Sequence, residues 1–154
     1  MPATDYWRNK LIDFQFRSAA LAKPTAWYLA WFTVAPTVAG GGTEVTGGAY
    51  ARQNLAPGDA NWYSTNGALS GNSSGATGLT SNGAAFTFPQ PTADWGVING
   101  LALFDAVSSG NMCFYGVLSN DPSVAGYIGF PPFGVYSGEG AVIVPAQALQ
   151  LLVT

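Results

Sequence analysis

The chain has 154 residues, of which 48% are hydrophobic, 14% aromatic and only 8% charged, and its net charge is −3. It contains no histidine and a single cysteine, Cys113, which excludes a zinc site, a histidine-assisted nucleophile and an intrachain disulfide. Soluble proteins carry roughly 25% charged residues on average. We therefore expect other protein subunits to cover much of the surface, and we expect Cys113 to be buried.

The first predicted element is a helix over Thr4–Leu21, with Thr4 or Asp5 as the N-cap and Pro24 beyond its end. An apolar stripe with helical spacing runs along it, formed by Trp7, Leu11 and Phe14. Whether this stripe packs on the chain's own sheet or on a neighbouring subunit is left open. Basic residues lie largely off the stripe and are either solvated or candidates for an interface with an acidic partner: Arg8, Lys10 and Arg17.

The rest of the chain is predicted to be all-β, as an antiparallel β-sandwich of about seven or eight short strands with long loops. We expect a single domain over residues 1–154, with a helical segment at 1–23 and the sandwich at 24–154. The first strand should be buried on both faces, the second half-exposed, and the fourth and fifth paired as a hairpin. The expected strands are Ala26–Val34, Ala49–Leu55, Phe86–Phe88, Val97–Phe104, Met112–Leu118, Ala141–Val144 and Gln147–Val153.

Two long irregular stretches, Asn61–Gly83 and Asp121–Gly140, interrupt the strands. Loops of such length are usually functional or ordered by a partner. Both contain aromatic side chains, which can clamp the chain's own core, form protein interfaces or stack on sugars. Our candidate interface residues in these loops are Trp62, Tyr63, Phe130, Phe133 and Tyr136.

Patterns that suggest catalysis or ligand binding are weak. Gly71–Gly75 matches the G-x-S-x-G nucleophile pattern, but it lies in a Ser/Gly-rich tract of a protein without histidine. The five basic residues are too few for a nucleic-acid surface, and no apolar run approaches the ~20 residues that span a bilayer. The start of the chain also lacks the pattern of a signal peptide. We therefore expect no enzyme activity, no catalytic, metal or cofactor residues, and neither nucleic acid nor a membrane as partner.

Several segments together resemble a family of small structural proteins of tailed bacteriophages, whose members tend to read YLALFT and then GTEVSGGGYARQ. The matching segments here are Trp27–Thr33, Gly42–Gln53, Phe86–Pro89, Thr92–Gly96, Gly100–Ala106, Ser109–Asn111, Tyr115–Gly116 and Ala141–Pro145. The resemblance covers most of the chain from Leu11 onward. It implies a non-catalytic virion protein that is assembled in the bacterial host cytoplasm.

Two roles are compatible with that resemblance. The first is a capsid decoration or cement protein that stabilises the head by bridging neighbouring major capsid proteins. The alternative is a tail-fibre or tail-associated module whose aromatic loops contact a glycan of the host surface. In either role we expect contacts with other virion proteins and a homo-oligomer.

Overall fold

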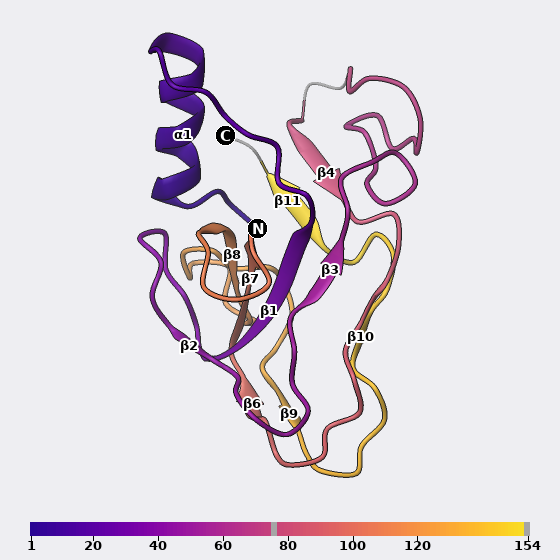
Figure 1. Cartoon of the computed structure of the whole chain (residues 1–154). Coiled ribbons are helices and arrows are strands. Elements are labelled where there is room, and N and C mark those ends of the chain that lie inside the picture. The colour runs from indigo at the N-terminus through magenta and orange to yellow at the C-terminus, as the bar shows by residue number, and fades with distance from the viewer. Residues whose placement is uncertain (75–76, 153–154) are drawn as a thin grey trace.

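The computed structural model describes residues 1–74 and 77–152, and over these residues the fold is mostly β with one helix (Figure 1). Two predicted features reach beyond this range, because Gly75 of the serine pattern and Val153 of the last predicted strand lie outside the described residues. The elements are α1 (Asp5–Phe16), β1 (Trp27–Val34), β2 (Thr43–Glu44), β3 (Gln53–Leu55), β4 (Leu79–Ser81), β5 (Phe86–Thr87), β6 (Gly96–Ile98), β7 (Gly100–Phe104), β8 (Met112–Val117), β9 (Phe133–Val135), β10 (Ile143–Val144) and β11 (Gln150–Leu152).

A five-stranded antiparallel sheet forms the centre of the fold, in the order β2-β1-β7-β8, with β3 also paired to β1. The β7–β8 hairpin is the one predicted from the sequence, and β1 pairs with β7 from Tyr28–Phe104 to Phe32–Gly100. The other strands pair two by two, as β10–β5, β11–β4 and β6–β9. The antiparallel all-β fold with an N-terminal helix is thus confirmed. The two-sheet sandwich stays a prediction, since these ladders do not join into a second continuous sheet.

The central strand β1 is buried on both faces, as its continuous apolar sequence predicted. Leu29 and Trp31 point into the main core, whereas Ala30 and Phe32 join a smaller cluster on the opposite face. Cys113 is also buried, and burial raises the pKa of its thiol to about 12, with the charge of Asp105 adding to the shift. At neutral pH this thiol is protonated and serves as core filler.

The helix is anchored to its own domain at its first turn. Thr4 caps it, since its hydroxyl oxygen accepts a hydrogen bond from the Trp7 backbone amide at 3.4 Å. The same hydroxyl donates to the Met112 carbonyl of β8 at 2.6 Å. Trp7 then packs edge-on against Trp27 with ring centroids 5.4 Å apart. The first turn of α1 therefore packs on the chain's own β8, and the Trp7 end of the predicted stripe lies against the central sheet.

The predicted helix end at Leu21 is wrong, because α1 stops at Phe16 and Arg17 already has an extended backbone. The second half of the helix has no surface of its own domain to pack on. Its apolar side chains stay exposed, with Phe16 83% accessible and Ile12 and Phe14 about half accessible. Packing of an apolar face usually provides most of a helix's stability. Residues after Phe16 would gain no such packing from a further helical turn, so the helix ends there.

The predicted strand over Ala49–Leu55 is wrong in its first half, since only Gln53–Leu55 form β3. Gly47, Gly48 and Ala49 all have positive φ angles, which produce a turn instead of an extended chain. Within this turn the Tyr50 backbone amide donates to the Gly47 carbonyl at 2.8 Å. The alternation of large and small side chains over Ala49–Arg52 therefore predicted a strand wrongly. Tyr50 and Arg52 instead turn inward and contact Glu44.

Other strand boundaries also differ from the prediction. The run Val97–Phe104 divides at Asn99, whose side-chain amide donates to the Thr33 carbonyl at 2.8 Å, so that β6 pairs with β9 and β7 with β1. The long loops contain two strands that the sequence did not reveal, β4 and β9. Together with β2, these short pieces raise the count over the described part of the chain above the seven or eight expected.

Candidate interaction surfaces

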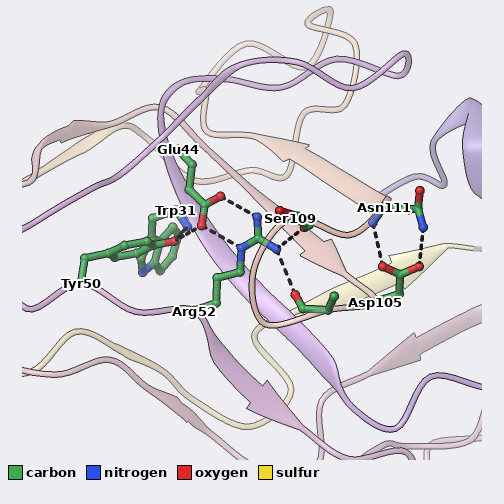
Figure 2. Close-up of polar contacts among 8 residues, drawn as sticks. Trp31, Glu44, Tyr50, Arg52, Asp105, Ser109 and Asn111 are labelled. Atoms are coloured by element: carbon green, nitrogen blue, oxygen red, sulfur yellow. Dashed lines mark hydrogen bonds and ion pairs between the residues drawn. The ribbon is translucent and has the colours of Figure 1, made fainter.

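One of the segments that resemble the phage family, Gly42–Gln53, builds an internal polar network around Arg52 (Figure 2). The Arg52 side chain is only 8% exposed and forms a two-point ion pair with Glu44: Nε lies 2.8 Å from Oε1 and Nη2 2.7 Å from Oε2. Its Nη1 donates to the carbonyls of Ala106 and Ser109 at 3.0 and 2.9 Å. The guanidinium also lies 3.6 Å from the ring centroid of Phe104. Arg52 thus fastens the β7–β8 loop to β2.

Tyr50 extends this network into the core. Its hydroxyl donates to Glu44 at 3.1 Å and accepts a hydrogen bond from the Trp31 backbone amide at 2.9 Å (Figure 2). Burial raises the pKa of Tyr50 well above its ordinary value, and the neighbouring Glu44 charge raises it further. The side-chain polar groups of Glu44, Tyr50 and Arg52 in this network each have a partner within the chain, whereas the buried indole Nε1 of Trp31 has none among the described residues. The polar side chains of Gly42–Gln53 that form this network therefore support the fold.

The three basic residues predicted for an interface are placed along α1. Arg8 forms an ion pair with Asp5 at 3.8 Å, and Arg17 forms one with Asp13 at 3.4 Å. The Lys10 ammonium lies 5.8 Å from the ring centroid of Tyr6. Each of these cations thus has a partner on the same helix, and the three do not form one bare basic patch. Their role in an interface stays a prediction.

Trp62 and Tyr63 lie together in a first cavity of ≈ 460 Å³, which we call the aromatic cleft. Its remaining aromatic lining comes from Trp7, Trp27 and Phe114. These three residues were predicted to lie in the helix stripe and in strands, and their place in a cleft was not predicted. The partial exposure of Trp7 and Trp27 could not be inferred from periodicity, because it depends on how α1 crosses the sheet.

Phe130 and Phe133 lie in a second, larger cavity of ≈ 770 Å³, which we call the apolar groove. Its rim leaves large side chains in contact with solvent: Phe130 is 60% exposed, and Ile143 and Tyr127 are also accessible. Its floor includes Trp31 and Leu101 of the central sheet. Tyr136 lines neither cavity and stays exposed. The five predicted loop aromatics therefore occupy three separate places.

In residues 1–74 and 77–152, no three His, Cys, Asp or Glu side chains come together in a way that could hold a metal ion. Within the same residues, no helix has the length and apolar character needed to span a bilayer.

Comparison with protein families identifies the family of this chain. The model of the family described as podophage GP4 fiber I protein gp80 matches residues 2–126. The chain belongs to this family. It is a bacteriophage structural protein, and a component of the virion. No curated protein matches the chain. The aromatic cleft lies within the matched residues except for Leu151, whereas most of the apolar groove is formed by residues after 126.

Proposed function

We propose that the chain is a non-enzymatic fibre subunit of a podophage particle. The observation behind this is the family match, which spans residues 2–126 and whose name refers to a fibre protein. The chemistry agrees with a purely structural role, since the chain has no histidine and Glu44 and Arg52, within the resembling segment Gly42–Gln53, are used for internal contacts. The capsid-decoration hypothesis is the weaker of the two sequence interpretations, because the family is named for a fibre.

The apolar groove is the surface that we assign to contacts with neighbouring virion proteins or with further copies of the chain. Exposed side chains as large as Phe130 and Ile143 cost free energy in water, at roughly 25 cal/mol for each Å² of apolar surface. Clustered exposed apolar residues on a soluble protein mark interaction sites. A subunit seated in the groove would cover Tyr127, Phe130 and Ile143 at once.

Copy number in the particle tests the fibre assignment. Purified virions are resolved on a denaturing gel, and the band of this chain is compared with that of the major capsid protein. A fibre attached around a ring-shaped tail structure should be present in a small multiple of the ring symmetry, on the order of a dozen copies. Hundreds of copies per particle would support a capsid decoration protein instead.

A surface variant tests the groove. Phe130→Ser should leave the fold intact, because the side chain is already 60% exposed, but it should lower the amount of the chain incorporated into virions. Val107→Ser is the control, because Val107 is an apolar side chain of similar exposure, 61%, that lines neither cavity and is no interface candidate. Equal incorporation of both variants would remove the groove from the assembly contacts.

A further inference from the structure

The aromatic cleft is built from elements that are distant in sequence. One wall is a cluster of three rings, in which Trp27 lies 5.4 Å from Trp7 and 6.0 Å from Phe114 between ring centroids. Trp62 and Tyr63, from the segment after β3, line the cleft as well. Thr80 of β4 and Leu151 of β11 add to the lining. Figure 1 shows α1 and the loop after β3 on either side of the β4–β11 ladder.

Several hydrogen-bonding groups in the cleft lack a protein partner. Among the described residues, none accepts a hydrogen bond from the indole N–H of Trp7 or Trp27, and none bonds to the Tyr63 hydroxyl. Lys23 and Asp59 are exposed and form no ion pair within that same part of the chain. The partial exposure of these groups leaves them available to a ligand, in contrast to the satisfied network around Arg52.

The lining also limits the charge and size of the ligand. Its ionisable residues are one cation, Lys23, and one acid, Asp59, together with tyrosine, so no net charge favours an ionic ligand. The volume of ≈ 460 Å³ falls within the roughly 300–1,000 Å³ of small-molecule sites. A nucleic acid would need several cations for its phosphates, and a purely apolar ligand would leave the polar groups unpaired at a cost.

We propose that the aromatic cleft binds a neutral saccharide, as part of a glycan on the host surface. A sugar ring presents apolar C–H faces that stack on indole and phenol rings, and its hydroxyl groups both donate and accept hydrogen bonds. Trp62 and Tyr63 provide stacking surface, Asp59 accepts from hydroxyl groups, and Lys23 and the indole N–H groups donate to them. The assignment of a host glycan as the source rests on the proposed fibre function, whereas the recognition of a neutral sugar rests on the cleft itself.

The experiment titrates the purified full chain with neutral methyl glycosides of glucose, galactose, rhamnose and N-acetylglucosamine, and with neutral oligosaccharides of these sugars. Tryptophan fluorescence reports binding, because three of the lining residues are tryptophans, and saturation-transfer NMR identifies the bound sugar. At least one probe should bind saturably. Trp62→Ala should raise its dissociation constant at least about tenfold, as expected for loss of a central aromatic contact.

Two further variants guard against a simple loss of folding. Asp59→Ala and Lys23→Ala change exposed side chains, and each should weaken sugar binding severalfold without altering thermal stability. Tyr136→Ala, at an exposed aromatic outside the cleft, should bind like the unmodified chain. The proposal is overturned if no probe binds, if the cleft variants bind as well as the unmodified chain, or if single-stranded DNA competes for the same site. None of these results would change the copy number measured in virions. The sugar site can therefore be disproved while the fibre assignment holds, and the reverse is also true.

Discussion

Arg52→Ala should destabilise the chain far more than any other substitution of a basic residue. The change removes the two-point ion pair with Glu44, two hydrogen bonds to loop carbonyls and the contact with the Phe104 ring. It also leaves the Glu44 carboxylate, whose side chain is 25% exposed, without its cationic partner.

The expected size of the effect follows from the burial of the pair. Removing one partner of a buried ion pair costs about 3–5 kcal/mol, mainly because the remaining charge is left uncompensated. For a chain of this length, 1 kcal/mol shifts the melting temperature by about 2–4 °C, so the loss should be roughly 6–20 °C. Arg52→Lys keeps the charge but loses the planar two-point geometry, so its melting temperature should lie between those of the unmodified chain and Arg52→Ala.

Thermal and denaturant unfolding followed by circular dichroism measures these differences. Arg17→Ala is the matched control, because that arginine is 73% exposed and its ion pair with Asp13 should contribute at most about 1 kcal/mol. A double-mutant cycle with Glu44→Gln isolates the coupling between the two side chains. The reasoning is refuted if Arg52→Ala costs no more than Arg17→Ala, or if the cycle shows no coupling.

Three further predictions concern the core and its turns. Tyr50→Phe leaves the Trp31 backbone amide without its acceptor and should cost about 1–3 kcal/mol in denaturant unfolding. The folded-state pKa of Tyr50 is raised above its ordinary value of 10.0, so its contribution to the free energy of unfolding is complete below pH 10.0 and is lost as the pH rises through the folded-state pKa. The free energy of unfolding of Tyr50→Phe should therefore fall less steeply above pH 10.0 than that of the unmodified chain, and an equally steep fall would contradict this. Cys113 should resist thiol reagents at pH 8 until the chain is unfolded, and rapid native labelling would show that it is not buried. Gly48→Ala should destabilise more than Gly47→Ala in thermal melts: both positions have positive φ, but only at Gly48 would a Cβ meet other atoms, 2.7 Å from the Ala93 carbonyl oxygen, and equal effects would argue against this packing.

The central sheet could be predicted because its strands are long, continuous apolar runs. The β1 sequence Trp27–Val34 and the β7–β8 pair carry enough β-branched and aromatic residues, bounded by turn residues, to specify buried strands. The shorter strands could not be found this way. Strands such as β4, with three residues, depend on partners far along the chain, and no local period indicates which partner that is.

The candidate surfaces were only partly accessible from the sequence. Selection of loop aromatics identified Trp62, Tyr63, Phe130 and Phe133, which all line a cavity. The same reasoning could not divide them between two cavities, since that depends on the folded paths of both loops. Trp27 was also predicted to lie in the core. Its partial exposure at the start of β1 could not be predicted, because the apolar sequence is continuous through the exposed and the buried part of the strand. The inward-facing Arg52 was missed for the opposite reason, as charge normally indicates exposure.

The most direct test of the fibre assignment is the position of the chain on the intact particle. Purified virions are labelled with antibodies raised against the recombinant chain, and gold-conjugated secondary antibodies are located by electron microscopy. The fibre assignment predicts gold confined to the tail and its appendages, with bare capsid faces. Gold distributed evenly over the capsid would contradict it and restore the decoration protein.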